Sequence, residues 1–381
     1  MSLTTRAAVL TATGAARPYA DSRPLSIQTV ELAPPGPGEV LVAVKAAGLC
    51  HSDLSVINGD RPRPLPMALG HEAAGVVEAL GPSVGGEGVT DLMVGDHVAM
   101  VFMPSCGHCS PCAEGRPALC EPGAAANGKG ELLGGGRRIF LEGAPVHHHL
   151  GCSAFADRAV VSRRSLVKID PELSFEEAAL FGCAVLTGVG AVVNTAGVRA
   201  GQSVVVVGLG GVGLASVLGA LACGASPVIA VDLNPDKLAL AASLGAVQTV
   251  NAADPDAVDQ VRALTNGGAD VAVEMAGSVR ALEAAWKMTR RGGLTVTAGL
   301  PPPDAALPVN VVSLVGEERT LKGSYIGTCV PGRDIPRYVA LYRQGRLPVD
   351  RLMSGVIALD DINAGFDRLH AGEVARLVVR I

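Results

Sequence analysis

The stretch from Ser203 to Asp232, SVVVVGLGGVGLASVLGALACGASPVIAVD, decides the fold class of this chain. A run of valines leads into clustered glycines, an apolar segment of helical length follows, and a second β-branched run ends on the aspartate. This order predicts a strand, a tight turn, a helix and a second, parallel strand. The stretch carries no charge before Asp232 and is long enough to span a bilayer, but its glycines and Pro227 argue against a membrane helix.

The glycines of this stretch match the pattern GxGxxG, which binds the pyrophosphate of a dinucleotide when it follows a strand and opens a helix. Gly208 is expected to make the tight turn, Gly210 to let backbone amides approach the phosphates, and Gly213 to let the helix pack closely on the strand. Gly211 belongs to the same predicted site. A glycine-rich turn that binds no nucleotide is the alternative interpretation.

The acidic residue that ends the second strand, Asp232, lies about 20 residues beyond the glycines. At that place a carboxylate accepts hydrogen bonds from the adenosine ribose, and Lys237 is positioned to help hold the same ribose. No arginine follows at position 233 or 234 to bind a 2′-phosphate. The sequence therefore predicts NAD rather than NADP as the cofactor.

The alternation of strands and helices continues toward the carboxyl end. Strands expected at 204–207, 228–231, 271–273 and 294–297 alternate with helical stretches such as 235–244, which predicts a parallel sheet with crossover helices.

Outside this central part the pattern changes. From Arg6 to about Gly182 short alternating segments, such as 40–45 and 74–79, lie between turns rich in proline and glycine, and this part is expected to be β-rich. From about Ile326 onward mixed short elements end in a strand-like segment at 375–381.

Composition narrows the function further. The chain has 381 residues, enough for two or three domains, and is 49% hydrophobic and 18% charged. Its 31 Lys and Arg against 36 Asp and Glu leave no basic surplus, so neither nucleic acid nor a membrane surface is an expected partner. The first residues lack the basic and apolar regions of a secretory signal, so a cytoplasmic location is expected. A second charge-free stretch, Ala178 to Val198, contains four glycines and is expected to form a buried helix.

Nine cysteines in a chain expected in the reducing cytoplasm point to metal binding or catalysis rather than to disulfides. Four of them, Cys106, Cys109, Cys112 and Cys120, lie within fifteen residues and suit a closed, tetrahedral structural zinc site. An iron–sulfur cluster is disfavoured because its fourth cysteine comes three residues after the third and precedes a proline, whereas here the gap is seven residues. Acidic neighbours disfavour a zinc ribbon that binds nucleic acid.

Three further residues form a second candidate metal set. Cys50 lies in the segment CHSD, His71 in GHE, and Cys183 follows Gly182. Each is ambiguous alone, because a buried cysteine or histidine is usually structural. Together they offer one nitrogen and two sulfur ligands and leave a fourth position for water or substrate, as a catalytic zinc requires.

The segments CHSD and GHE, the four-cysteine loop, the GLGGVG turn and the ribose aspartate resemble, in this order, the zinc-dependent medium-chain alcohol dehydrogenases over essentially the whole chain. The resemblance implies an α/β fold in which a GroES-like, β-rich catalytic domain is split around a Rossmann domain with a doubly wound parallel sheet. Residues 1–184 and 325–381 would form the catalytic domain, and residues 185–324 the Rossmann domain.

The resemblance also assigns roles to residues around the metal. It implies two zinc ions per chain, the catalytic one bound by Cys50, His71 and Cys183, with the carboxylates of Asp53 and Glu72 orienting the histidine and tuning the metal.

Further roles concern substrate and cofactor. Ser52 would bind the substrate oxygen and begin a proton relay through the nicotinamide ribose, with His51 near the pyrophosphate or the relay. Thr187 and Val212 would pack against the nicotinamide, and Arg376 would touch the pyrophosphate. Relatives often end the relay with a histidine at the position that Ser55 occupies here, so His51 is the expected proton carrier.

The alcohol pocket of the family involves positions occupied here by Ser52, Phe102, His149, Leu150, Leu300 and Tyr325. His149 closes a run of three histidines where relatives often have an aromatic residue. Two interpretations are open: this side chain binds a polar group of the substrate, or the run lies on a mobile loop.

The expected activity is hydride transfer between a primary alcohol and NAD, with zinc as the Lewis acid. Secondary alcohols or polyols, ω-hydroxy acids attracted by Arg61, a nicotinoprotein that retains its NAD, and a non-catalytic zinc protein are the alternatives. The insert at about 123–148 resembles that of the dimeric branch, which predicts a homodimer. The glutathione-dependent formaldehyde dehydrogenases of that branch carry an acidic residue and an arginine where this chain has Arg61 and Ala124.

Overall fold

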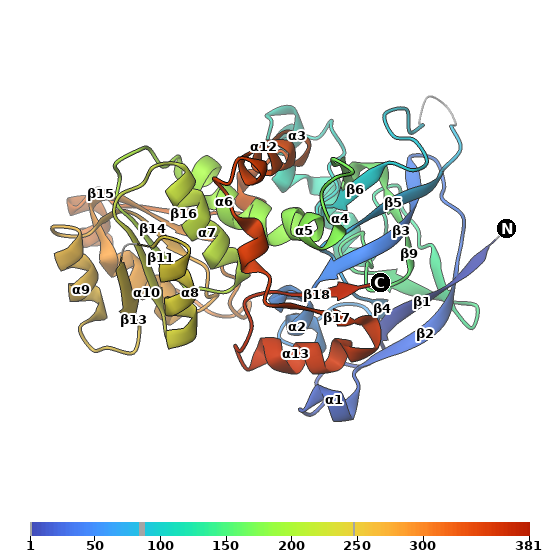
Figure 1. Cartoon of the computed structure of the whole chain (residues 1–381), viewed down its shortest axis with the longest axis horizontal. Helices are drawn as coiled ribbons and strands as arrows, with labels where there is room; N and C mark the ends of the chain where they lie inside the picture. Colours follow the sequence, from blue (N-terminus) through green and yellow to red (C-terminus); the bar gives the residue numbers. More distant parts are fainter. Residues whose placement is uncertain (1, 84–87, 247) are drawn as a thin grey trace. The chain divides into compact units, whose positions relative to one another are not determined.

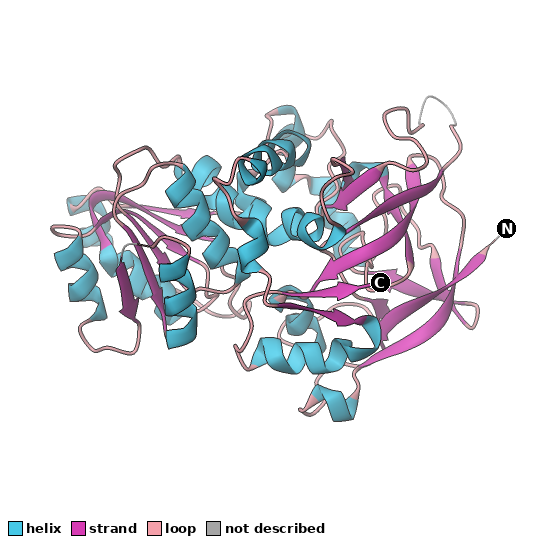
Figure 2. Ribbon diagram, viewed as in Figure 1, coloured by secondary structure: helices cyan, strands magenta, loops and turns pink. Residues whose placement is uncertain are grey.

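The valine run and its neighbours form the centre of a six-stranded parallel sheet (Figures 1 and 2). The strands lie in the order β13-β12-β11-β14-β15-β16, so the chain starts in the middle, extends to one edge, and then returns to build the other half. This is the doubly wound Rossmann order and confirms the predicted fold class. The strands are β11 (Val204–Val207), β12 (Val228–Asp232), β13 (Gln248–Asn251), β14 (Ala269–Glu274), β15 (Thr289–Thr297) and β16 (Thr320–Gly323).

The central strands have continuous apolar sequences because both of their faces are buried. All four valines of β11 are at most 4% exposed, as expected for a parallel strand covered on both faces. The helices that accompany this sheet are α7 (Gly211–Ala222), α8 (Pro235–Ser243), α9 (Ala257–Leu264), α10 (Val279–Met288) and α11 (Val311–Gly316).

The amino-terminal part is β-rich, as predicted. Five strands form a closed barrel in the order β1-β2-β7-β8-β4, and a second sheet has the order β10-β6-β5-β3-β18-β17, with β9 also paired to β3. The strands are β1 (Leu3–Leu10), β2 (Leu25–Leu32), β3 (Glu39–Gly48), β4 (Met67–Ala68), β5 (Ala73–Leu80), β6 (His97–Met100), β7 (Ile139–Leu141), β8 (Ala144–His148), β9 (Arg158–Ser162), β10 (Leu166–Lys168), β17 (Gly355–Ala358) and β18 (Leu377–Arg380).

Helices connect and cover these strands. They are α1 (Tyr19–Ser22), α2 (His51–Ile57), α3 (Ser110–Ala113), α4 (Glu121–Lys129), α5 (Phe175–Leu180), α6 (Leu186–Gly190), α12 (Pro331–Arg343) and α13 (Ile362–His370). The last strand, β18, pairs antiparallel with β3, so that Val378 lies opposite Gly48. This pairing brings the carboxyl end of the chain into the β-rich part.

The computed structural model describes residues 2–83, 88–246 and 248–381, and the chain divides into two units. The β-rich unit contains Met1–Cys183, Val330–Arg337 and Met353–Ile381, and the Rossmann unit contains Ala184–Cys329 and Tyr338–Leu352. The first boundary lies next to the predicted one at residue 184. The carboxyl-terminal boundary differs from the predicted return at 325, because residues 338–352 bind within the Rossmann unit: Arg346 and Arg351 donate to the carbonyls of Ala222 and Ser243.

One helical segment, Phe175–Ala196, is long and apolar enough to cross a membrane by length and composition. It combines α5 and α6 with two π-helical segments, Phe181–Val185 and Ala191–Ala196. In its most apolar window 89% of the residues are buried inside the structure, which confirms the prediction of a buried helix.

The run of three histidines is ordered and lies inside the β-rich unit. His147 and His148 belong to β8, which pairs in parallel with β4, and His148 and His149 are at most 1% exposed. The interpretation of this run as part of a mobile loop is therefore wrong, because strand pairing fixes its backbone.

Burial of His148 predicts an acid-dependent loss of stability. Its Nε2 accepts the backbone N–H of Arg138 at 3.0 Å, and burial together with the nearby Arg137 and Arg138 lowers its pKa to about 3. The unfolded chain therefore binds one more proton than the folded chain between about pH 6.5 and about pH 3. We expect the free energy of unfolding to fall toward acid in this window, by at most about 1.4 kcal/mol per pH unit from this group.

The measurement is chemical unfolding at several pH values for the wild type and for His148→Gln. Glutamine offers a neutral acceptor to the Arg138 N–H, so its stability should depend less steeply on pH between about 6.5 and about 4. Equal slopes for the two proteins would show that His148 does not titrate on unfolding.

Candidate active site and zinc clusters

The three predicted catalytic-zinc ligands come together inside the β-rich unit. Cys50 precedes α2, His71 lies between β4 and β5, and Cys183 lies in the first π-helical segment. Their ligand atoms and a carboxylate oxygen of Glu72 all lie within 4.8 Å of one another, and the Cys183 Sγ is 3.5 Å from His71 Nε2. None of these four side chains is more than 6% exposed.

Two glycines allow this close approach. Gly70, next to His71, has a φ of +96°, and a Cβ there would collide with the backbone N of Phe155. A Cβ on Gly182, next to Cys183, would collide with the carbonyl of Met100. Any larger residue at either position would push a ligand away from the cluster.

The electrostatics of the cluster fit a bound cation. The contact with the Cys183 thiol lowers the pKa of Cys50 well below its ordinary value, although burial opposes this, so a thiolate forms here readily. Burial raises the pKa of Glu72 to about 7, and both of its carboxylate oxygens are buried without a hydrogen-bond partner among the described residues. Soft sulfur and imidazole donors beside an unsatisfied carboxylate suit zinc.

The carboxylate of Asp53 lies beside His71, the predicted zinc ligand. Its Oδ2 is 3.1 Å from His71 Nδ1, and its Oδ1 accepts the backbone N–H of Gly70 at 3.1 Å. The pKa of Asp53 is about 2, because the adjacent His71 and His149 outweigh the effect of burial. An ionised carboxylate at Nδ1 keeps the hydrogen there and leaves the Nε2 lone pair for a metal.

Arg376 lies beside this cluster. Its guanidinium is 3% exposed, its Nη1 donates to the carbonyl of Leu49 at 2.8 Å, and it lies 3.4 Å from Glu72 Oε2. The pairing of β18 with β3 carries it there. Contact with a pyrophosphate stays a prediction, whereas the ion pair with Glu72 was not predicted, because nothing local in the sequence links these two residues.

The predicted proton-relay residues lie at the start of α2. Ser52 is half-buried and His51 is exposed. Ser55, which replaces the histidine of many relatives, donates its hydroxyl hydrogen to the carbonyl of His51 at 2.9 Å. This hydrogen therefore serves the helix backbone.

The predicted pocket residues divide between the two units. In the β-rich unit the rings of Phe102 and His149 lie edge-on to the ring of His71, with centroids 5.5 and 5.4 Å away, and Leu150 is 8% exposed. Leu300 and Tyr325 belong to the Rossmann unit and are 54% and 38% exposed.

His149 has its own polar contact. Its Nδ1 lies 3.1 Å from Asp53 Oδ1, so the ring is held against the carboxylate that supports His71. Binding of a polar substrate group by His149 stays a prediction. The contact between His149 and Asp53 was not predicted. Its one indication in the sequence was a histidine at a pocket position where relatives often have an aromatic residue.

The glycine turn of the Rossmann unit has the expected geometry. Gly208 has a φ of +91°, and a Cβ on Gly213 would collide with the carbonyl of Gly208. Gly210 directly precedes α7, which begins at Gly211, and a Cβ on Gly210 would meet no described atom within 4 Å. The N-terminus of α7 is therefore open to an approaching phosphate.

The carboxylate of Asp232 is fixed at the end of β12. Its Oδ2 accepts the N–H of Leu209 at 2.6 Å and its Oδ1 accepts that of Asn234 at 2.9 Å. Each oxygen keeps a lone pair for a ribose hydroxyl. Lys237 is half-buried in α8.

The two residues expected at the nicotinamide lie on helices that pack together. Gly188, next to Thr187, packs on the carbonyl of Val212, and the hydroxyl of Ser216 donates toward the carbonyls of both Gly188 and Val212. Thr187 and Val212 are both partly exposed. This close packing of α6 on α7 brings them to one region of the Rossmann unit.

The four-cysteine loop folds into a second cluster. The ligand sulfurs of all four cysteines lie within 4.8 Å of one another. The sulfur of Cys106 accepts the N–H groups of His108 and Cys109, which lower its pKa to about 6 although burial opposes this. The sulfur of Cys120 accepts the N–H groups of Cys106 and Gly123 at 3.2 and 3.4 Å. Backbone N–H groups aimed at sulfur stabilise thiolates, so this loop also fits zinc.

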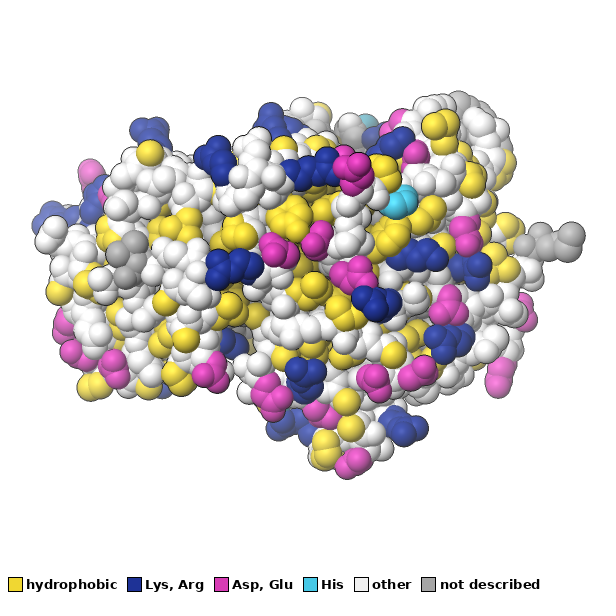
Figure 3. Space-filling view, viewed as in Figure 1, with side chains coloured by type: hydrophobic (Ala, Val, Ile, Leu, Met, Phe, Trp, Pro, Cys, Tyr) yellow, Lys and Arg dark blue, Asp and Glu magenta, His cyan; other side chains and the backbone are white. Residues whose placement is uncertain are grey.

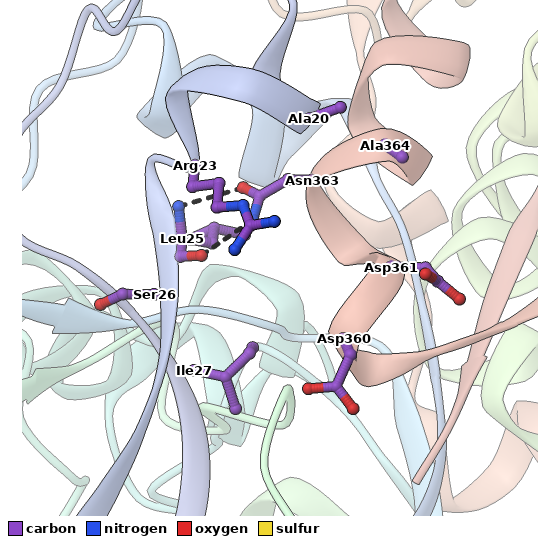
Figure 4. A pocket seen from close by; sticks show the side chains of 9 residues that line it. All are labelled: Ala20, Arg23, Leu25, Ser26, Ile27, Asp360, Asp361, Asn363 and Ala364. Atoms are coloured by element: carbon purple, nitrogen blue, oxygen red, sulfur yellow. Dashed lines mark hydrogen bonds between the residues drawn. The ribbon is translucent and has the colours of Figure 1, made fainter.

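A cavity of about 570 Å³ with both polar and apolar lining residues lies elsewhere in the β-rich unit (Figure 4). It lies beside the Asn363 amide, which bridges the N–H and the carbonyl of Leu25. None of the predicted site residues lines it. The lining residues are Ala20, Arg23, Leu25, Ser26, Ile27, Asp360, Asp361, Asn363 and Ala364.

Two family models match this chain. "Alcohol dehydrogenase GroES-like domain" matches residues 36–171, and "Zinc-binding dehydrogenase" matches residues 211–344. S-(hydroxymethyl)glutathione dehydrogenase of Paracoccus denitrificans is 37% identical over 367 residues, which cover 94% of this chain and 96% of its own.

Solved structures agree over the full length. An alcohol dehydrogenase zinc-binding domain protein from Burkholderia ambifaria has a TM-score of 0.93 and 36% identity, with 100% of both chains covered. Benzyl alcohol dehydrogenase from Acinetobacter calcoaceticus has a TM-score of 0.91 and 33% identity, covering 100% of this chain and 99% of its own.

Proposed function

The chain belongs to the zinc-dependent medium-chain alcohol dehydrogenases, and on this premise we propose that it interconverts primary alcohols and aldehydes with NAD. The buried set of Cys50, His71 and Cys183 beside the unsatisfied carboxylate of Glu72 carries this proposal. A protein that had lost its chemistry would have no use for this costly arrangement of buried polar groups.

The side chains around the metal site have separate roles in the oxidation of the alcohol. Cys50, His71 and Cys183 would hold the zinc ion, which when bound would supply a Lewis acid that lowers the pKa of the alcohol. Asp53 keeps the hydrogen of His71 on Nδ1, so that Nε2 faces the two sulfurs.

The proton and the hydride leave by different routes. The Ser52 hydroxyl takes up the alcohol proton as it releases its own proton into the relay, and the exposed His51 delivers a proton to solvent, because the hydrogen of Ser55 is bound to the helix backbone. The carbon-bound hydrogen leaves with its electron pair to NAD, and the aldehyde remains. The products are aldehyde, NADH and one proton.

The carboxylate of Asp232 supports NAD over NADP. The N–H groups of Leu209 and Asn234 hold it in place, and its charge would repel a 2′-phosphate. Free thiols in both cysteine clusters also suit the reducing cytoplasm, which is the compartment that we propose.

The substrate is proposed to be a simple primary alcohol with an apolar body. Relatives of this chain act on S-(hydroxymethyl)glutathione or benzyl alcohol, according to their names. Arg61 and Ala124 stand where the family resemblance places the acidic residue and the arginine that serve glutathione. Phe102, whose ring lies edge-on to that of His71, favours an apolar or aromatic alcohol, and so does Leu150, which follows His149 in the chain.

We expect kcat/KM for benzyl alcohol to exceed that for S-(hydroxymethyl)glutathione and for secondary alcohols by about tenfold or more. NADH formation with these compounds and with an ω-hydroxy acid measures the preference. Arg61→Ala is the matched variant, and it should leave the rate with benzyl alcohol unchanged. The highest kcat/KM with S-(hydroxymethyl)glutathione would contradict the proposed substrate class. If Arg61→Ala lowers kcat/KM for the ω-hydroxy acid alone, ω-hydroxy acids would become the proposed substrates instead.

A homodimer is proposed from an apolar edge of the Rossmann unit. Strand β16 ends the sheet and its residues are exposed, and on the preceding helix α11 Val311, Val312 and Val315 are 68%, 81% and 71% exposed. An open strand edge, preceded in the chain by a helix with exposed valines, is a surface that proteins cover. A second copy of this chain, related by a two-fold axis, covers it with the same surface. On the face drawn in Figure 3 acidic and basic side chains are interspersed.

We expect Val312→Glu to convert the dimer to a monomer of 38.5 kDa, because the interface would bury an unpaired charge. Light scattering after gel filtration measures the mass. Leu264→Glu, at a partly exposed apolar residue of α9, is the matched control and should stay dimeric. A wild-type monomer, or two variants of equal mass, would contradict this interface.

A further inference from the structure

The carboxylate of Asp53 faces two imidazole rings rather than one. His71 Nδ1 lies 3.1 Å from Oδ2 and forms a hydrogen bond with Oδ1 at 3.2 Å. Oδ1 also accepts the N–H of Gly70 and lies 3.1 Å from His149 Nδ1. The two rings stand at 89° with their centroids 5.4 Å apart. One buried carboxylate thus connects His71, a proposed zinc ligand, to a histidine outside the proposed set of Cys50, His71 and Cys183.

Nδ1 of His149 has one polar neighbour, the carboxylate of Asp53, among the described residues. The side chain is 2% exposed, and apart from the Asp53 contact Nδ1 has no polar partner among the described residues. The contact has the distance of an ion pair, and Nδ1 forms no hydrogen bond among the described residues. A neutral imidazole against a carboxylate is favourable only with its hydrogen on the facing nitrogen, so Asp53 fixes the Nδ1–H tautomer.

The backbone also fixes His149. It directly follows β8, and its own N–H donates to the hydroxyl of Ser153 at 3.0 Å. Asp53, in contrast, lies on α2, and His71 lies in the turn after β4. His149 therefore ties a third segment of the β-rich unit to the carboxylate.

Loss of this contact would leave Asp53 with one polar neighbour fewer. The side chain of Asp53 is 0% exposed, so no water replaces a missing N–H group. A buried carboxylate with one polar neighbour fewer is less favourable in its ionised form and less firmly oriented toward His71. The Nδ1–H of His71 would then be held less well, and its Nε2 would be a weaker ligand.

We propose that His149 is a positioning residue that holds the Asp53 carboxylate against Nδ1 of His71 and thereby helps to retain the catalytic zinc. This inference rests on the zinc site of the proposed function. It concerns binding of the metal by this chain and does not depend on which alcohol is the substrate.

Three variants test this role. His149→Asn places an amide N–H close to where Nδ1 stands, His149→Gln places it farther out, and His149→Phe keeps the ring without a donor. The rate of zinc transfer to a chromogenic chelator is measured for the zinc-loaded proteins. The phase that is absent in Cys183→Ala belongs to the catalytic site, and the phase that is absent in Cys120→Ser belongs to the structural site.

We expect the catalytic-site phase to be about tenfold faster in His149→Phe and His149→Gln and close to wild type in His149→Asn. The structural-site phase should be unchanged in all three and serves as an internal control. A role in filling space predicts the opposite order, with phenylalanine closest to wild type because asparagine leaves a cavity.

Other outcomes would contradict the positioning role of His149. Equal catalytic-site rates in wild type and His149→Phe would overturn the proposal, and so would equal acceleration in Asn and Phe. If His149→Phe unfolds and both phases accelerate, the catalytic-site rates of His149→Asn and His149→Gln are compared instead. Equal rates in these two variants would overturn the proposal. A wild type that releases only one zinc per chain would instead contradict the zinc site of the proposed function.

Discussion

Replacing Cys183 by alanine is expected to remove one of two zinc ions per chain and to reduce kcat/KM at least about 10³-fold, since the Lewis acid contributes several kcal/mol to the transition state. Cys183 is 5% exposed and lies 3.5 Å from His71 Nε2, and without its sulfur only one thiolate, one imidazole and the harder Glu72 carboxylate remain to bind zinc there. The four-cysteine cluster should keep its zinc, because it shares no ligand with this site.

Elemental analysis and NADH formation measure the two effects together. Cys223→Ala is the matched control, since this cysteine lies just after α7 and belongs to neither cluster. It should retain both zinc ions and full activity. A Cys183→Ala protein that keeps two zinc ions, or that turns over at the wild-type rate, would show that the catalytic metal is bound elsewhere.

The second large effect is expected from Arg376→Leu, which should lower the free energy of unfolding by about 3–5 kcal/mol. The side chains of Arg376 and Glu72 are 3% and 0% exposed and lie 3.4 Å apart, so the substitution leaves a buried carboxylate without its counter-charge. The carboxylate can escape part of this cost by taking up a proton, because burial already raises its pKa to about 7.

A double-mutant cycle separates this effect from lost packing. Arg376→Leu is measured by chemical unfolding of the zinc-loaded enzyme, alone and combined with Glu72→Gln. In the Glu72→Gln protein position 72 carries no charge. Arg376→Leu should therefore lower the free energy of unfolding by at least about 2 kcal/mol less than it does in the wild type. An equal cost in both backgrounds would mean that the arginine contributes only through packing and its bond to the Leu49 carbonyl.

The sequence predicts the centre of the Rossmann sheet well because its signals are local. The valine run, the glycine turn and the second β-branched run each occupy a few consecutive residues, and β11, α7 and β12 form there. Strands β13 and β16 were not predicted, because QTVN and TLKG are short and largely exposed edge strands without an apolar run. Edge strands bury one face at most, so their sequences carry a weak pattern.

The candidate site follows the same rule. The four-cysteine loop is a local spacing, and the histidine and cysteines of the second set were recognisable by their ligand chemistry and by family resemblance. The ion pair of Glu72 with Arg376 depends on the pairing of β18 with β3, between residues far apart in the chain. The contact of His149 with Asp53 depends on the pairing of β8 with β4. Neither pairing leaves a local pattern.

The most direct test of the whole account is NADH formation from benzyl alcohol and NAD as the enzyme is reloaded with zinc after chelation. The account predicts that the structural cluster and the Cys50, His71 and Cys183 site each take one zinc, and that activity rises in proportion to occupancy of the latter. Full zinc at both sites and bound NAD, with no NADH from benzyl alcohol or any other primary alcohol, would contradict it.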